Sequence, residues 1–304
     1  MRAKKFSLII VAFVFLLLLI AALLHSQDFA YNENTLLLQY QLKKLKKNLH
    51  TDVETIIVGD SSAGNAIDAS YFSQLSKSQT LNLALTGSYG LIGTYNMMQR
   101  ALQEHKEIQN VLIMQSFDVW YRPLSLTSYF KTRVTPLSDM KAIIDNIYSQ
   151  YLAYILNIKE LNCFVKYLTK EPHYSIDTAN DFLKIKAATY ANTKKKFRES
   201  NRLKEGVDGD KIAILKRIDA LCGTKKLHCS YLHGPLHVSL VQKDSTIINS
   251  INKILTQSMK NIHFNPMPYA VAQRKLGDSN DHMDIAFKKE STKEIYERMK
   301  KEKN

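Results

Sequence analysis

The sequence predicts an α/β fold, in which crossover helices connect the strands of a parallel sheet. Two observations support this prediction. Short apolar runs end repeatedly at small residues and are followed by helical patterns, which is the order of a crossover unit. The chain has 304 residues and is 45% hydrophobic, which is enough to bury a large core. A transmembrane helix before this domain and a helical insertion inside it complete the predicted architecture.

The N-terminal segment is predicted to anchor the chain in a membrane. Residues 6–24 contain one polar side chain, Ser7, and as a helix they span roughly 28 Å, the thickness of a bilayer core. Basic residues precede this segment and none follows it closely, so the positive-inside rule places the N-terminus in the cytoplasm. A cleaved signal peptide is the competing interpretation, but the apolar core is long and no small-x-small cleavage site follows it. Residues 1–25 are therefore assigned to a cytoplasmic tail and anchor.

Residues 26–50 are predicted to contain a basic juxtamembrane helix. Leu38, Leu42, Leu45 and Leu49 recur at helical spacing, and lysines stand between them. Such a helix either lies on a lipid surface or packs on the domain that follows.

The strands of the sheet are read from apolar runs that end at turns. Strands are predicted over residues 55–58, 81–85, 111–114, 227–232 and 261–264. A helix is predicted over residues 238–259, and a charged helix closes the chain. Because ligands of parallel α/β sheets bind at the carboxyl ends of the strands, the functional site is expected at the turns that follow them.

This alternation stops between about residues 123 and 210. The pattern there is that of long helices over residues 139–159 and 178–204, without strand signals. We interpret it as a helical insertion, basic on its exposed faces, within a domain that spans residues 51–304.

The three cysteines are compatible with an exported protein. Cys222 and Cys229 are close enough in sequence for a local disulfide, which leaves Cys163 over. Three unpaired thiols are the alternative. The cysteines lack the CxxC spacing of zinc ligands, so no metal is expected, and no cofactor is assigned.

One serine stands where a nucleophile would lie. Ser61 directly follows the first core strand and precedes a predicted helix, which places its hydroxyl at the edge of the sheet. A serine needs a base, and the base needs an acid that orients it. Asp278, Asp281 and His282 supply both if the fold brings them to Ser61. The alternative role of Ser61 is to cap the helix that follows.

Together these segments resemble the SGNH, or GDS-type, hydrolase and acyltransferase superfamily. The resemblance covers roughly residues 52–300 and includes the Gly-Asp-Ser tripeptide that ends at Ser61, Gly87 after the second strand, and an Asp/His pair before the last helix. It implies a flavodoxin-like three-layer α/β/α domain. It further implies Ser61 as nucleophile, His282 as base, and an oxyanion hole formed by the amides of Ser61 and Gly87.

Two features depart from the family pattern. The family usually has a Gly-x-Asn donor after the third strand, where this chain has Gln-Ser-Phe-Asp at residues 115–118, so a third oxyanion donor is not assigned. The family's acid usually stands three residues before the histidine, whereas Asp278 stands four before His282 and Asp281 is adjacent to it. We favour Asp278, because neighbouring side chains usually point apart and a one-turn spacing can bring its carboxylate to the imidazole. Asp281 remains the alternative acid.

The predicted anchor, the exported GDS-type domain and the basic helical insertion together make the chain most similar to the branch of this superfamily that works beside membrane-bound O-acyltransferases. Its members O-acetylate peptidoglycan or alginate, or D-alanylate teichoic acid. The resemblance implies a single-pass protein of the bacterial inner (cytoplasmic) membrane with a periplasmic or extracellular domain. It would accept an acyl group, expected to be acetyl, from an integral-membrane O-acyltransferase. Through acyl-Ser61 it would then pass that group to an anionic or neutral envelope glycan.

The net charge and the expected compartment limit the classes of macromolecule that the chain could bind. With 42 Lys and Arg against 28 Asp and Glu, the net charge of +14 favours an anionic polymer as acceptor. An exported domain without a recognition motif is not expected to bind nucleic acid. Two other functions stay open: an esterase or deacetylase of the same fold, and a non-catalytic scaffold of a polysaccharide-modification complex.

Overall fold

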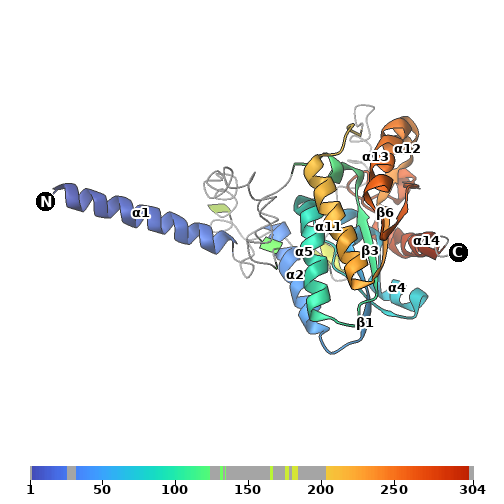
Figure 1. Ribbon diagram of the computed structural model, residues 1–304, viewed down its shortest axis with the longest axis horizontal. Coiled ribbons are helices and arrows are strands. Elements are labelled where there is room, and N and C mark those ends of the chain that lie inside the picture. The colour runs from blue at the N-terminus through green and yellow to red at the C-terminus, as the bar shows by residue number, and fades with distance from the viewer. Residues whose placement is uncertain are drawn as a thin grey trace.

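The fold is known from a computed structural model, which describes residues 2–25, 32–123 and 203–300 and the short segments 131–132, 134, 165–166, 175–177 and 180–183. Its centre is a five-stranded parallel sheet in the order β2-β1-β3-β6-β8, with helices on both faces (Figure 1). The strands are β1 (Val53–Gly59), β2 (Gln79–Asn82), β3 (Asn110–Gln115), β6 (His228–His233) and β8 (Ile262–Asn265). The predicted α/β class is confirmed.

The sheet separates two hydrophobic cores. In β3, Val111 and Ile113 belong to one core, whereas Leu112 and Met114 belong to the other, because successive side chains of a strand point to opposite faces. Helices α5 (Gly90–Glu104), α11 (Gly209–Lys225) and α13 (Ser245–Ser258) contribute to the first core. Helices α3 (Ser61–Ala66), α4 (Ala69–Ser76) and α14 (Lys288–Lys300) contribute to the second. Burial on both faces explains why the strands read as continuous apolar runs.

Short elements surround the sheet. They are η1 (Gly87–Tyr89), η2 (Phe117–Trp120), β4 (Ile176–Asp177), β5 (Phe182–Leu183), β7 (Pro235–His237), α12 (Val238–Lys243), β9 (Tyr269–Val271), η4 (Gln273–Lys275) and η5 (Ile285–Phe287). Strands β4 and β5 pair antiparallel, and β7 and β9 pair parallel.

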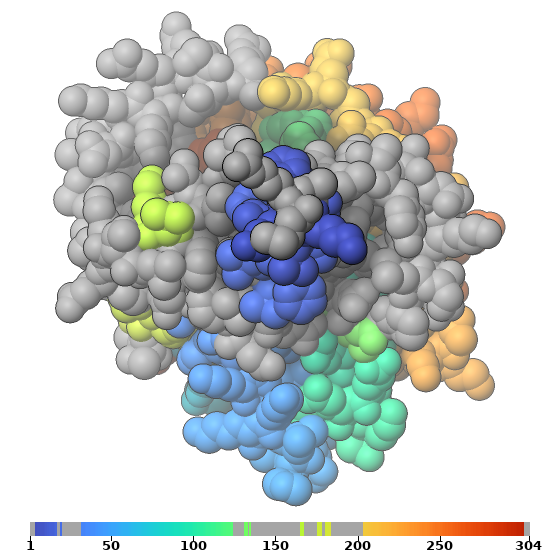
Figure 2. Space-filling model, turned by 90° about the vertical axis from the view of Figure 1, so that its left-hand side faces the viewer, coloured from blue at the N-terminus to red at the C-terminus, as the bar shows by residue number. Residues whose placement is uncertain are grey.

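Helix α2 (Glu33–Lys47) packs on the domain. Leu37, Leu38 and Leu45 are buried, and α2 lies beside α5 in Figure 2. Leu49, which was expected on the same face, is exposed because the helix ends at Lys47. Of the two roles considered for this basic helix, packing on the domain is the one observed.

Helix α1 (Arg2–His25) projects away from the sheet and its helices (Figure 1). Large apolar side chains on it are exposed, among them Phe6, Leu8 and Val11. Among the described residues, no helix has both the length and the hydropathy of a membrane span. The transmembrane anchor therefore stays a prediction.

The insertion between residues 123 and 210 is described only in short segments. The predicted helix over residues 139–159 lies outside the described residues. The helix predicted over residues 178–204 is wrong where it can be checked, because Phe182–Leu183 is strand β5. The chain reverses between β4 and β5 at Asp181, whose φ is +53°, and a left-handed residue at a tight turn ends any helix.

The prediction of a single helix over residues 238–259 is also wrong, because this segment forms two helices. Helix α12 ends at Lys243 and α13 begins at Ser245. Between them, the carboxylate of Asp244 accepts a hydrogen bond of 2.9 Å from the backbone N of Leu203. This contact joins the break to a segment 41 residues earlier in the chain, which helical periodicity does not reveal.

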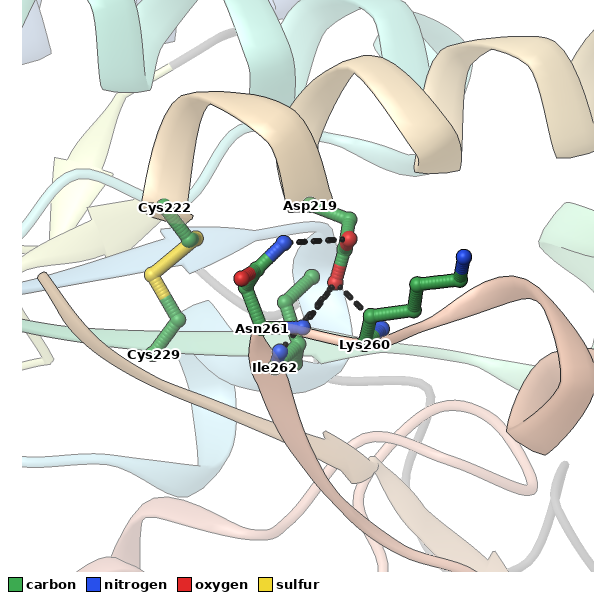
Figure 3. The surroundings of a disulfide bond; sticks show 6 residues. All are labelled: Asp219, Cys222, Cys229, Lys260, Asn261 and Ile262. Carbon is green, nitrogen blue, oxygen red and sulfur yellow. Dashed lines mark hydrogen bonds between the residues drawn. A yellow bond between two sulfur atoms is a disulfide. The ribbon is translucent and has the colours of Figure 1, made fainter. Parts of the chain in front are cut away.

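Helix α11 is joined to the sheet at two points (Figure 3). Cys222 of α11 and Cys229 of β6 form a disulfide with a Sγ–Sγ distance of 2.07 Å. One turn earlier, Asp219 accepts hydrogen bonds from the backbone N atoms of residues 260–262 at 2.8, 2.7 and 3.1 Å. Both contacts lie at the amino ends of β6 and β8, away from the strand ends where the site was expected. Cys163 lies outside the described residues.

Candidate active site

The turn after β1 presents Ser61 at the carboxyl edge of the sheet. Its sharp form depends on Gly59, because a Cβ atom there would lie 1.8 Å from the carbonyl oxygen of Met114 in the neighbouring strand. Asp60 then caps helix α3, and Ser61 is the first residue of that helix. Sequence and backbone geometry together therefore place the Ser61 hydroxyl beyond the end of β1.

Asp60 ties this turn to the turn after β3. Its Oδ1 accepts hydrogen bonds from the N and Oγ atoms of Ser62, at 3.0 and 2.6 Å. Its Oδ2 accepts hydrogen bonds from the N and Oγ atoms of Ser116, at 2.9 and 2.6 Å. Asp60 is buried, so these four bonds replace the water that its carboxylate loses. The Ser62 hydroxyl is thereby hydrogen-bonded to Asp60, whereas the Ser61 hydroxyl is not.

The sequence interpretation did not foresee this structural role of Asp60 and Ser116. The available signal was their position, since each stands two residues after the end of a predicted core strand and β1 pairs with β3.

Ser61, His282 and Asp278 form a hydrogen-bonded series. The Nε2 atom of His282 lies 2.8 Å from Ser61 Oγ, and its Nδ1 atom lies 2.7 Å from Asp278 Oδ1. When Nδ1–H is donated to the carboxylate, the lone pair of Nε2 points at the Ser61 hydroxyl. This is the arrangement in which a histidine takes the proton of a serine nucleophile.

Backbone contacts hold the two ends of the loop that carries His282 together. Leu276 and Met283 form an antiparallel bridge, and Gly277 N donates to the carbonyl oxygen of His282 at 2.8 Å. The loop is attached to β7 as well, because His237 N donates to the carbonyl oxygen of Asn280 at 2.9 Å. The spacing of four residues between Asp278 and His282 is thus spanned by a closed loop and not by a helical turn.

Asp281 approaches the other ring nitrogen. Its Oδ1 lies 3.9 Å from His282 Nε2, beyond hydrogen-bond distance, and it accepts a hydrogen bond from Ser279 Oγ. Of the two candidate acids, Asp278 is therefore the one that holds Nδ1, while Asp281 is a nearby negative charge.

The carboxylates around His282 favour its protonated form. Burial by itself would lower the pKa of His282, but the charges of Asp281, Asp278 and Asp60 raise it by more, to about 9. Burial raises the pKa of Asp281 in turn, and the positive charge of His282 partly offsets that effect. In the free protein the ring is thus mostly charged at neutral pH.

This pKa predicts an alkaline pH profile for any reaction in which Ser61 is the nucleophile. His282 must be neutral to accept the serine proton, and with a pKa of about 9 roughly 1 molecule in 100 has a neutral ring at pH 7. The kcat/KM for p-nitrophenyl acetate, measured from pH 6 to 10 and corrected for spontaneous hydrolysis, is expected to rise with pH and level off above about 9. A rise of kcat/KM with its midpoint near pH 6.5, the ordinary pKa of histidine, would contradict this electrostatic account.

The series opens into a cavity of about 230 Å³, which Ser61, Gly87, Asp278 and His282 line together. Within the described part of the chain, the backbone N–H groups of Ser61 and Gly87 donate no hydrogen bond. Both are therefore available to a ligand oxygen, as an oxyanion hole requires.

A cation lies against Gly87. A Cβ atom at Gly87 would lie 2.0 Å from Nη1 of Arg122, so the guanidinium packs directly on the glycine. Arg122 pairs with Asp118 through Nη2 and lines the cavity. Its positive charge therefore lies beside Gly87, in the cavity for which no third oxyanion donor could be assigned from the sequence. Trp120, two residues earlier, is fully buried against Tyr231.

No described residues form a group of three histidine, cysteine or carboxylate side chains suited to a metal ion. The site does contain a serine hydroxyl, an imidazole, a carboxylate and two amides that have no hydrogen-bond partner among the described residues. Groups of these types in this arrangement can perform acyl transfer through an acyl-serine. Comparisons of the chain with known protein families, with curated proteins and with solved structures found no match.

Proposed function

We propose that this chain is an exported, membrane-anchored serine O-acyltransferase that acts on a cell-envelope polysaccharide, with acetyl as the acyl group. The observation that carries the proposal is the series Ser61–His282–Asp278 at the mouth of a cavity at the carboxyl edge of the sheet. Two of these residues are 221 positions apart in sequence, so a helix-capping role for Ser61 does not account for their meeting.

The proposed reaction has two steps. In the first, Ser61 Oγ attacks the carbonyl carbon of a donor ester, His282 Nε2 takes the serine proton, and the tetrahedral oxyanion is bound by the amides of Ser61 and Gly87. The donor C–O bond breaks, and His282 returns the proton to the leaving alcohol. In the second, a glycan hydroxyl attacks acyl-Ser61 while His282 takes its proton and delivers it to Ser61 Oγ. Asp278 orients the ring and stabilises the imidazolium.

The fold and the N-terminus support the rest of the proposal. The strand order, second-first-third-fourth-fifth along the chain, is that of flavodoxin-like domains, whose ligands bind at the carboxyl ends of the strands. The exposed apolar side chains of α1 suit insertion in the bacterial inner membrane beside an integral-membrane O-acyltransferase as donor. The net charge of +14 suits an anionic acceptor.

The competing functions differ in the fate of the acyl group. An esterase would pass it to water, and a scaffold would not accept it at all. Transfer requires that a sugar hydroxyl be positioned at acyl-Ser61 in place of water.

The test supplies p-nitrophenyl acetate to the full-length protein in detergent, with and without peptidoglycan fragments, alginate oligosaccharides or teichoic acid. Release of p-nitrophenolate, acetate and acetylated glycan is measured for each. The proposal predicts acetylated glycan at the expense of free acetate when the right acceptor is present. Acetate alone with every acceptor would support the esterase. Absence of any turnover, together with normal envelope acylation in cells that carry Ser61→Ala, would support the scaffold.

A further inference from the structure

Most of the side chains that line the cavity beside Ser61 are polar. Twelve described residues line it, and two of them, Phe182 and Leu183, have hydrocarbon side chains. Both belong to strand β5, which follows the turn at residues 180–181. Among the described lining residues, the hydrocarbon side chains that an acyl group on Ser61 could meet therefore come from this hairpin.

The ring of Phe182 packs against the helix that carries the nucleophile. A Cβ atom at Gly64 would lie 2.2 Å from Cε2 of Phe182, so ring and backbone are in direct contact. Gly64 lies one helical turn after Ser61, and Phe182 is 2% exposed. The ring is thus held close to the site with little room to move.

The buried amine of Lys288 in α14 fixes one side of the hairpin turn. Its Nζ donates to the carbonyl oxygen of Gly64 at 2.8 Å, to Asn180 Oδ1 at 2.7 Å and to the carbonyl oxygen of Asn180. Asn180 Nδ2 donates in turn to Asn65 Oδ1 at 3.1 Å, and Asn65 Nδ2 donates to the carbonyl oxygen of Ser61 at 2.8 Å. The hairpin and the nucleophile are thereby parts of one hydrogen-bonded network.

Helix α2 fixes the other side of the turn. The Nζ atom of Lys44 lies 2.6 Å from Asp181 Oδ2 and donates to the carbonyl oxygen of Asn82 at 2.7 Å, while the hydroxyl of Tyr40 donates to Asp181 Oδ1. With α2, α3 and α14 all bound to residues 180 and 181, the position of Phe182 is set from three directions. A buried wall with this support does not withdraw to admit a longer chain without breaking several of these bonds.

We propose that Phe182, together with Leu183, is the wall against which the hydrocarbon part of the acyl group packs, and that Phe182 restricts the enzyme to short acyl groups of acetyl size. This inference rests on the proposed acyl transfer through Ser61 and adds to it the residue that selects the acyl group. Lys288, Asn180 and Asp181 act as positioning residues that hold this wall.

The test measures acyl-chain preference. The kcat/KM values for p-nitrophenyl acetate, butyrate and hexanoate are determined for the full-length wild type, Phe182→Ala and Phe182→Leu. Space for added methylenes changes discrimination by about 10-fold or more, so the butyrate-to-acetate ratio is expected to rise by at least about that factor in Phe182→Ala. A smaller rise is expected in Phe182→Leu, which retains most of the side-chain volume and serves if the alanine variant does not fold.

The matched control is Phe72→Ala. Phe72 is 1% exposed and belongs to the same hydrophobic core as Phe182, but it does not line this cavity. Its removal is expected to leave the butyrate-to-acetate ratio unchanged. An unchanged ratio in both Phe182 variants, or an equal rise in Phe72→Ala, would overturn the inference while acetate turnover keeps the proposed function intact. No turnover of any ester by the wild type would contradict the proposed function itself, and the inference with it.

Discussion

Replacing Ser61 with alanine is expected to lower the turnover of p-nitrophenyl acetate by roughly 10⁴- to 10⁶-fold, the range seen when a member of a serine triad is removed. The reason is the loss of the only oxygen that His282 Nε2 faces at hydrogen-bond distance among the described residues, since the adjacent Ser62 hydroxyl is bound to Asp60. Steady-state release of p-nitrophenolate measures the effect.

Ser258→Ala is the matched control for the Ser61 variant. In the wild type, the hydroxyl of Ser258 donates to the carbonyl oxygen of Ile254 within α13, and Ser258 does not line the cavity. The turnover of p-nitrophenyl acetate by the Ser258→Ala protein is therefore expected to stay at the wild-type level. Near-normal turnover in a folded Ser61→Ala protein would show that another group performs the chemistry.

Asp278→Asn is expected to lower kcat/KM by about 10⁴-fold, as loss of the orienting carboxylate does in serine triads. An amide NH₂ facing Nδ1 favours the tautomer that carries its proton on Nε2, and that nitrogen can no longer take the proton of Ser61. Asp281→Asn is expected to lower kcat/KM much less than Asp278→Asn does, because Asp281 makes no hydrogen bond to the ring.

The two variants also differ in their pH profiles. The charge of Asp281 raises the pKa of His282, so Asp281→Asn is expected to move the rising limb of kcat/KM to lower pH. A loss of activity at Asp281 as large as that at Asp278 would contradict the assignment of the orienting acid.

The sheet and the pairing of distant site residues were accessible to sequence reasoning. Buried strands that end at small residues give a strong local signal, and the carboxyl-edge rule then places Ser61 beside whatever follows the last strands. The pairing of Ser61 with His282, at opposite ends of the domain, came from the need of a serine nucleophile for a base and from the resemblance to the SGNH superfamily, and the two side chains lie 2.8 Å apart. The sequence favoured Asp278 through a helical spacing, whereas the structure brings it to the ring through the closed loop between Leu276 and Met283.

Contacts between segments far apart in sequence were not accessible in this way. The hairpin at Phe182 lay inside a segment with a helical pattern, and its position is set by Lys44 and Lys288, which are more than 100 residues from it. In the sequence, the two lysines stand among other charged residues of helical segments, and nothing in the pattern marks either as buried. The withdrawal of their amines from water, nearly complete for Lys288 and partial for Lys44, is compensated by carbonyl and carboxylate partners that only the tertiary structure assembles.

The most direct test of the account is to locate the acyl group on the protein. The full-length chain is mixed with p-nitrophenyl acetate at pH 9, quenched rapidly in acid and digested, and the peptide that contains residues 59–65 is fragmented in a mass spectrometer. The account predicts an acetyl group on Ser61 that is absent from the Ser61→Ala protein. An acetyl group on Ser62 instead, or consumption of the ester with Ser61 unmodified at every quench time, would contradict it.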